Sequence, residues 1–335
     1  MIKKVCKIIL DDIKNNKWFY ICLVIISLLF LIKLDYNVLS PGKLISLNDR
    51  IIVEDGYDSK GSFNLTYVSS RSGTISNILL SYIIPNWDIE PVDNMRIESE
   101  DENEIVERNK LYLRETSYDA IISAFNEAHI EYKLINNNII VTHVFEEANT
   151  DLMVGDIIKS VNGVKVNNYK ELSLEIEKYN ENDEITLTVL RKDKVIECKS
   201  KLFKKNDTVY IGISLSELKN IETNPKVKYV FEDNESGSSR GLMCALEIYN
   251  RITEFDLTKG KTISGTGTID ENGVVGAIGG VKYKLLGAYK NKADIFIVPS
   301  DNYDEALEVK KDNNLNIDIY SADNLHDVIE YLKNY

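Results

Sequence analysis

The last part of the chain, from Asp207 to Tyr335, alternates short apolar strands with amphipathic helices. The strands are predicted at Val227–Asp233, in "KTISGTGTI" and in "DIFIVPS", and helices are predicted to begin near Leu242 and Val281. Strands that alternate with helices favour a sheet covered by helices. We therefore expect an α/β (α+β) fold for the segment 207–335.

Composition restricts the class of protein further. The 335 residues predict roughly two domains, and 44% hydrophobic with 28% charged residues is typical of a globular chain. A net charge of −13 argues against nucleic acid as a partner, because phosphate binding needs a basic surface. The four cysteines predict neither a disulfide framework nor a zinc site, since their spacing is irregular: Cys6, Cys22, Cys198 and Cys244.

An uncharged apolar run, Trp18–Ile32, lies near the N-terminus and is preceded by five lysines. With Leu34 and snorkelling flanking lysines it predicts a transmembrane anchor over residues 18–34. The positive-inside rule then places residues 1–17 in the cytoplasm and the rest outside a bacterial cell membrane. A cleaved signal peptide is the rival interpretation, although no small-residue cleavage site follows, and a buried core helix is a third.

The juxtamembrane segment 40–115 begins with a predicted β-hairpin, with one strand from Ile51 and the other through Phe63–Val68. A helix is predicted at Ser76–Ile84. The acidic stretch Glu98–Glu107 reads as a solvated helix face or loop. Thr116 is predicted to cap a helix that runs through Ala128.

Residues 118–205 have a different pattern. Strand Ile139–Val144 leads to "GDIIKSVNG" (Gly155–Gly163), which contains an Asn-Gly turn signal, and then to a helix at Tyr169–Tyr179 and a strand at Ile185–Leu190. This succession resembles a PDZ domain. The resemblance implies a groove between an edge strand and the helix, in which an extended peptide is captured. A small β module that only spaces other parts is the alternative.

A nucleophile is suggested by "GSSRG" (Gly237–Gly241), where two serines stand between glycines directly before a helix. Of the three histidines, His129, His143 and His326, the last is the only triad candidate in this part of the chain. A serine can instead use a lysine whose pKa is lowered by burial. Lys282, after the apolar "IGGV", fits that role.

Two motifs resemble signatures of Lon-type proteases. "GSSRG" followed by a helix resembles the G-P-S-A-G signature, and "GTGTIDENGVVGAIGGVKYKLL" resembles the second one, which ends in I-G-G-x-K. The resemblance implies that Ser239 is the nucleophile, Lys282 the general base and Thr266 the residue that hydrogen-bonds the lysine amine. The glycines Gly237 and Gly241 let a substrate backbone approach closely.

The departures from the Lon signature are Ser238 in place of proline and Arg240 in place of alanine. Ser238 makes the loop less rigid and is an alternative nucleophile. Arg240 either steers acidic peptides or points outward. A phosphate-binding glycine loop is disfavoured, since Tyr283 follows Lys282 where such loops have Ser or Thr. We therefore expect no nucleotide, no metal and no other cofactor.

The whole chain resembles the membrane-anchored PDZ–Lon-like serine proteases of bacteria. The resemblance implies an ATP-independent endopeptidase that cuts extracytoplasmic proteins or peptides, with the PDZ-like part inserted between two parts of the protease, 40–115 and 207–335. Three domains in series are the alternative arrangement. An inactive peptide-binding scaffold and a dyad used only for self-cleavage are the competing functions. The sequence leaves open the substrate, the cleavage preference and whether subunits form oligomers.

Overall fold

The computed structural model describes residues 12–92, 97, 100, 102–232, 235 and 237–335. Most of the predicted cytoplasmic segment 1–17, parts of the acidic stretch 98–107 and the end of the predicted strand 227–233 lie outside these residues. The chain divides into two compact units, residues 1–42 with 68–95 and residues 43–67 with 96–335.

The smaller unit contains the apolar segment. Its elements are α2 (Lys17–Leu31), the first part of β1 (Lys33–Ser46), the second part of β3 (Ser62–Thr74), α3 (Ile75–Ser81) and β4 (Asp88–Pro91). Helix α2 has 15 residues and ends before Lys33, where β1 begins, so the predicted span 18–34 is not one helix. Among the described residues, no helix is both long and apolar enough to cross a membrane.

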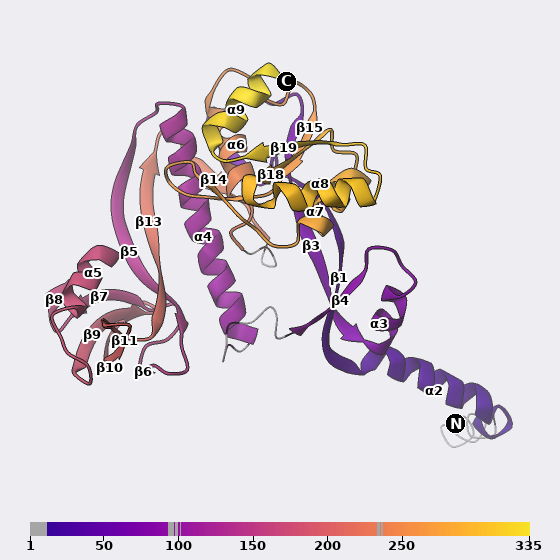
Figure 1. The fold of residues 1–335 in the computed structure, drawn as a ribbon, viewed down its shortest axis with the longest axis horizontal. Helices are drawn as coiled ribbons and strands as arrows, with labels where there is room; N and C mark the ends of the chain where they lie inside the picture. The colour runs from indigo at the N-terminus through magenta and orange to yellow at the C-terminus, as the bar shows by residue number, and fades with distance from the viewer. Residues whose placement is uncertain (1–11, 93–96, 98–99, 101, 233–234, 236) are drawn as a thin grey trace, which may run out of the picture. The chain divides into compact units, whose positions relative to one another are not determined.

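The larger unit is built around a sheet whose strands come from distant parts of the chain (Figure 1). The strand order is β19-β18-β15-β3-β1-β4, in which β1 and β3 continue into the smaller unit. The other strands here are β15 (Thr262–Gly265), β18 (Ile295–Pro299) and β19 (Asp318–Ala322). The strand predicted at Phe63–Val68 therefore belongs to the same sheet as the C-terminal strands, because β3 pairs in parallel with β15.

Helices cover both faces of this sheet. They are α4 (Glu102–Glu127), α6 (Gly241–Ile252), α7 (Val281–Lys290), α8 (Tyr303–Asp312) after the 3₁₀ turn η2 (Ser300–Asn302), and α9 (Leu325–Asn334). Every residue of β18 is buried, as expected for a strand covered on both sides. Ile295 and Ile297 point to the core around α6 and α9, and Phe296 and Val298 to the core around α7 and α8.

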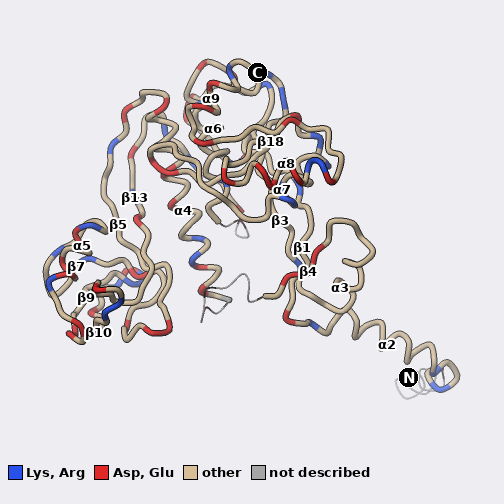
Figure 2. Tube along the Cα trace, viewed as in Figure 1, with Lys and Arg blue, Asp and Glu red and all other residues tan. Residues whose placement is uncertain are grey.

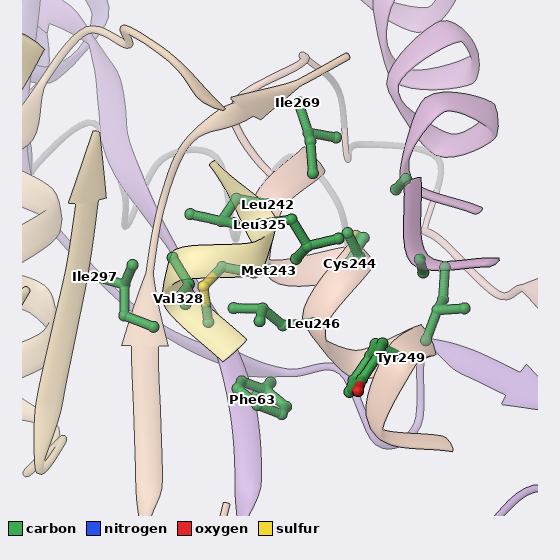
Figure 3. Close-up of a cluster of buried hydrophobic side chains, with 14 of the residues drawn as sticks. Phe63, Leu242, Met243, Cys244, Leu246, Tyr249, Ile269, Ile297, Leu325 and Val328 are labelled. Atoms are coloured by element: carbon green, nitrogen blue, oxygen red, sulfur yellow. The ribbon is translucent and has the colours of Figure 1, made fainter. Parts of the chain in front are cut away.

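Helix α6 is the most enclosed of these helices. Figure 3 shows Leu242, Met243 and Leu246 packed close to Phe63 of β3 and Val328 of α9. Each fully buried Leu or Phe side chain stabilises the fold by about 1.5–3 kcal/mol, so this cluster fixes the start of α6 firmly.

The predicted β-hairpin between Ile51 and Val68 is wrong. Strand β2 (Ile51–Val53) pairs with β14 (Val227–Tyr229), far along the chain, while β3 joins the large sheet. The two strands do not pair with each other, because Ile51 and Phe63 are each buried in the core around α6. A further short pair consists of β16 (Thr268–Ile269) and β17 (Val275–Gly276).

The predicted start of the helix at Thr116 is also wrong. Helix α4 begins at Glu102, so Thr116 lies in its interior. One reason for the longer helix is a buried ion pair at its first turns, where Arg108 binds the carboxylate of Glu100 through two nitrogens. Burial alone would raise the pKa of Glu100, but the Arg108 guanidinium and the Ile97 N–H lower it overall.

A second sheet has its own core and forms the PDZ-like module, residues 132–223. Its strand order is β13-β5-β7-β9-β10-β6, with β8 paired to β7. Its elements are β5 (Tyr132–Val144), β6 (Asn149–Thr150), β7 (Ile157–Val161), β8 (Val164–Lys165), α5 (Tyr169–Ile176), β9 (Glu184–Arg191), β10 (Lys194–Lys201), the hairpin of β11 (Phe203–Lys205) and β12 (Thr208–Tyr210), and β13 (Ile213–Thr223). Asn162 and Gly163 both have positive φ, as the predicted Asn-Gly turn requires.

Candidate active site

The loop Gly237–Arg240, here called the Ser239 loop, leads directly into the N-terminus of α6. Arg240 is the N-cap residue, so Ser239 stands one position before the cap. Gly237 has a φ of +89°, a backbone conformation that favours glycine. Space is not the reason for glycine here, because no atom lies within 4 Å of an added Cβ. Ser238 and Ser239 are both partly exposed.

The backbone of the Ser239 loop is held by strand β15 and its continuation. The carbonyl of Ser239 accepts hydrogen bonds from the Gly267 N–H (2.9 Å) and from the Thr266 hydroxyl (3.0 Å). Among the described residues, the N–H of Ser239 itself has no hydrogen-bond acceptor. An unpaired N–H beside a hydroxyl at a helix start can stabilise negative charge on a substrate oxygen.

A buried lysine lies next to this loop, and it is Lys284. Its side chain belongs to the second turn of α7 and only 5% of the residue is exposed. The Nζ of Lys284 donates a hydrogen bond to Thr266 Oγ1 over 3.1 Å. Burial lowers the pKa of Lys284 from 10.5 to about 8, so about a tenth of the amine is neutral at pH 7 and about half at pH 8.

The lysine predicted for this place was Lys282. Lys282 is partly exposed, and its Nζ lies 5.6 Å from the ring centroid of Tyr283. The hydrogen bond to Thr266 that the resemblance implied for Lys282 is made by Lys284. Two positions along a helix are about 200° apart, so the two lysines point to different sides of α7.

Helical phase could have found Lys284 from the sequence. Val281, Leu285 and Ala288 are fully buried and lie three or four residues from one another, on one face of α7. Lys284 is three residues after Val281 and four before Ala288, so it shares that face. The prediction of Lys282 used only its distance from Gly279 and Gly280 along the chain and did not use the helical phase of α7.

Arg240 is not outward-pointing. Its guanidinium donates to Glu235 over 2.8 Å and stacks on the Phe231 ring at 4.6 Å, and both members of the ion pair are nearly buried. Arg50 approaches the same Glu235 carboxylate at 3.2 Å. The charge of Arg240 is therefore balanced inside the protein, where it ties the start of the loop to the start of α6.

Helix α4 also reaches the Ser239 loop. The Gly237 N–H donates to the Asn109 carbonyl (3.1 Å), and the Thr116 hydroxyl donates to the Ser238 carbonyl (3.3 Å). A Cβ at Gly241 would lie 2.5 Å from Thr116 Oγ1. Gly241 is thus required for the close approach of α4 and α6, a role different from the substrate access predicted for it.

The histidines lie elsewhere. His326 Nδ1 is hydrogen-bonded to Glu127 on an exposed face, and His143 Nδ1 lies 3.5 Å from the buried Glu100. Within the described ranges, no group of three or more His, Cys, Asp and Glu residues is placed to hold a metal ion.

A groove lies in the PDZ-like module between α5 and β13. Strand β13 is at the end of its sheet, so one of its edges is unpaired in the strand order. A cavity of about 380 Å³ opens there, lined mainly by apolar and aromatic side chains, among them Phe145, Tyr169, Leu172, Phe203, Ile213 and Leu215. This place corresponds to the edge-strand and helix groove that the sequence predicted.

Comparison with known proteins gives matches for the C-terminal part of the chain and for a segment that overlaps the PDZ-like module. Residues 234–334 match the family model of the Lon protease (S16) C-terminal proteolytic domain, and residues 124–192 match that of the T15H9.4-like protein N-terminal domain. Lon protease 2 of Borreliella burgdorferi is 26% identical over 206 residues, 60% of this chain and 25% of that protein. Lon protease of Campylobacter jejuni is 37% identical over 70 residues, 21% of this chain and 9% of that protein.

Among solved structures, the PDZ domain of the SdrC-like protein Lmo2051 from Listeria monocytogenes is 24% identical. It covers 25% of this chain and 92% of its own, with a TM-score of 0.23. The chain spans about a quarter or less of the length of the curated relatives it matches. The predicted resemblance to Lon-type proteases is confirmed for the C-terminal part of the chain. Over residues 234–334, the C-terminal part is similar to the Lon protease C-terminal proteolytic domain.

Proposed function

We propose that the protein is an ATP-independent serine endopeptidase in which Ser239 is the nucleophile and Lys284, in place of Lys282, is the general base. One observation carries this proposal: the buried Lys284 amine, with a pKa of about 8, is joined through the Thr266 hydroxyl to the carbonyl of Ser239. A neutral amine in such a place can accept a proton, whereas an ordinary lysine near neutral pH cannot.

The proposed reaction is acyl transfer. The Ser239 hydroxyl attacks the carbonyl carbon of the scissile peptide, and its proton passes to the neutral Lys284 amine. The oxygen of the tetrahedral intermediate receives a hydrogen bond from the Ser239 N–H. The C–N bond then breaks, the leaving amine takes the proton from Lys284, and water hydrolyses the resulting ester with Lys284 acting again as base.

The proposed substrate is an unfolded polypeptide whose free segment adds to the edge of β13. The apolar lining of the groove between α5 and β13 supports this proposal, since main-chain pairing supplies affinity and side-chain pockets supply preference. A nucleic-acid partner is not proposed, because the net charge is −13 and α8 carries acidic as well as basic residues (Figure 2).

We also propose attachment to a bacterial cell membrane through α2, with the catalytic part outside the cytoplasm. In its support, α2 buries none of its residues and exposes large apolar side chains, and the apolar run 18–32 is flanked by Lys14, Lys17 and Lys33. Membrane fractionation, followed by digestion of intact cells from outside, tests attachment and orientation. Recovery of the chain in the soluble fraction would refute the attachment.

The proposed activity is tested with the full chain purified in detergent and casein as an unfolded substrate, without ATP. Ser239→Ala and Lys284→Ala should each reduce the cleavage rate by at least about a hundredfold. The matched controls Ser238→Ala and Lys282→Ala should stay within a few-fold of the wild-type chain. Cleavage by Ser239→Ala at the wild-type rate would refute the proposal and leave the inactive peptide-binding scaffold. Loss of activity in Lys282→Ala but not in Lys284→Ala would restore the original assignment of the base.

A further inference from the structure

The peptide unit between Ser238 and Ser239 links two features of the site. Its carbonyl belongs to Ser238 and its N–H to Ser239, and a trans peptide is planar, so the two groups point in opposite directions. Any contact that holds the Ser238 carbonyl in one direction therefore also fixes the direction of the Ser239 N–H.

Two donors hold the Ser238 carbonyl. The Gly241 N–H, in the first turn of α6, donates over 3.2 Å, and the Thr116 hydroxyl donates over 3.3 Å. Thr116 is 3% exposed and lies in α4, which is 122 residues away along the chain. Threonine hydroxyls in helix interiors commonly bond a carbonyl of the preceding turn, but that of Thr116 is directed across to the loop.

The contact requires a glycine at 241. An added Cβ there would lie 2.5 Å from Thr116 Oγ1, well inside contact distance, so any larger residue would push α4 away from the loop. A second bond from the same helix, between the Gly237 N–H and the Asn109 carbonyl, fixes the other end of the loop. Helix α4 thus holds the loop at two points.

The Ser239 N–H is available to a ligand. Among the described residues it has no acceptor, and it precedes the N-cap of α6, where the helix dipole favours negative charge. Hydrogen-bond donors that are already oriented toward a developing oxyanion stabilise the transition state more than the bound substrate.

We propose that Thr116 is a positioning residue for the reaction: by holding the Ser238 carbonyl it keeps the Ser239 N–H directed at the substrate oxyanion. This inference rests on the proposed role of Ser239 as nucleophile. Thr116 itself does not touch the substrate, and its contribution appears when the tetrahedral intermediate forms.

The experiment compares Thr116→Val, which keeps the shape and removes the donor, with Thr116→Ser, which keeps the donor. The full chain in detergent cleaves a fluorogenic peptide, and kcat and KM are measured separately. Thr116→Val should lower kcat by about 10-fold to 100-fold with KM within about twofold of the wild-type value, because only transition-state binding is lost. Thr116→Ser should restore most of kcat.

Two further measurements separate positioning from loss of structure. The melting temperature of each variant shows whether it is folded, and the pH at which kcat is half-maximal should not move, because Lys284 is untouched. If Thr116→Val does not fold, Thr116→Ala carries the same expectation. Wild-type kcat in a folded variant without the donor, or equal impairment in Thr116→Ser, overturns the inference. If Ser239→Ala also cleaves at the wild-type rate, the proposed function itself has failed; with Ser239→Ala inactive, only the role of Thr116 is refuted.

Discussion

The side-chain nitrogen of Lys284 lies 3.1 Å from the hydroxyl oxygen of Thr266, and both residues are almost fully buried. The Thr266 hydroxyl in turn donates to the Ser239 carbonyl. This chain of two hydrogen bonds connects the second turn of α7 to the loop before α6. It places an amine of lowered pKa beside a partly exposed serine.

The pH dependence of cleavage should follow the neutral fraction of Lys284. Because burial lowers its pKa to about 8, the rate should rise about tenfold per pH unit below pH 7 and level off above pH 9. Measurement of kcat/KM between pH 6 and 10 checks this, and Lys282→Ala should leave the curve unchanged. A rate that does not vary with pH over this range contradicts Lys284 as the base.

The same lysine should make stability depend on pH. Its folded pKa of about 8 is below the unfolded value of 10.5, so the unfolded chain binds more protons between these values. The free energy of unfolding therefore rises with pH between about 8 and 10.5, because the cost of burying a charged lysine disappears as Lys284 loses its proton. As the pH falls toward 8 this cost returns. Compared with Lys284→Met, denaturant unfolding of the wild-type chain at pH 8 and pH 10 should show this gain, and an equal change in both proteins would argue against it.

Arg240→Ala should destabilise the protein and slow cleavage. The substitution removes the 2.8 Å partner of the nearly buried Glu235 carboxylate, which keeps only Arg50 at 3.2 Å, and it removes the stacking on Phe231. Loss of one member of such a pair costs about 3–5 kcal/mol of unfolding free energy. Denaturant unfolding gives this value, and Arg114→Ala, on the exposed face of α4, should change it by less than about 0.5 kcal/mol. Equal effects of the two substitutions would show that the pair does not hold the loop.

Gly265→Ala should disturb the packing of β15 against α6, next to the candidate active site. Its Cβ would lie 2.6 Å from the Met243 sulfur and 2.7 Å from the Ile297 carbonyl, so β15 and α6 would have to separate. We expect a loss of about 1–3 kcal/mol in stability together with slower cleavage, since Thr266 follows directly. Gly279→Ala is the matched control, because nothing lies within 4 Å of its added Cβ. Thermal unfolding and casein cleavage of both variants test the difference, and an unaffected Gly265→Ala would contradict it.

Tyr169→Ala should weaken capture of substrate without changing the chemical step. Tyr169 is exposed at the groove between α5 and β13, so its removal takes away apolar contact area but no buried core. KM for casein should rise about fivefold or more while kcat stays the same. Val195→Ala, on an exposed position of β10, serves as control. A fall in kcat with unchanged KM would show that the groove does not bind substrate.

Local patterns in the sequence were enough for several elements. The alternation of strands and helices after Asp207, the all-apolar strand Ile295–Pro299 and the Asn162-Gly163 turn depend on neighbouring residues, and the structure has all three. The position of Ser239 at a helix start was equally readable, because glycines and hydroxyl residues before an amphipathic stretch mark such a start.

Other features depended on contacts between distant segments. The partner of β2 is β14 rather than β3, and Thr116 lies inside a helix that begins at Glu102, where a buried Arg108 ion pair extends it. Neither a hairpin pattern nor a cap signal contains information about a strand more than 170 residues away or about a carboxylate brought in by folding.

The sequence by itself determined that a serine-containing loop precedes α6 and that a glycine-rich turn precedes α7. It predicted a PDZ-like module between two parts of an α/β fold, with three domains in series as the alternative. Tertiary structure decided which lysine of α7 is buried beside the Ser239 loop and which contacts hold the backbone of that loop. Burial lowers the pKa of a lysine, and folding buries Lys284 on the inner face of α7. The carbonyl of Ser238 accepts a hydrogen bond from Thr116, which is 122 residues away along the chain, so no local pattern contains this contact.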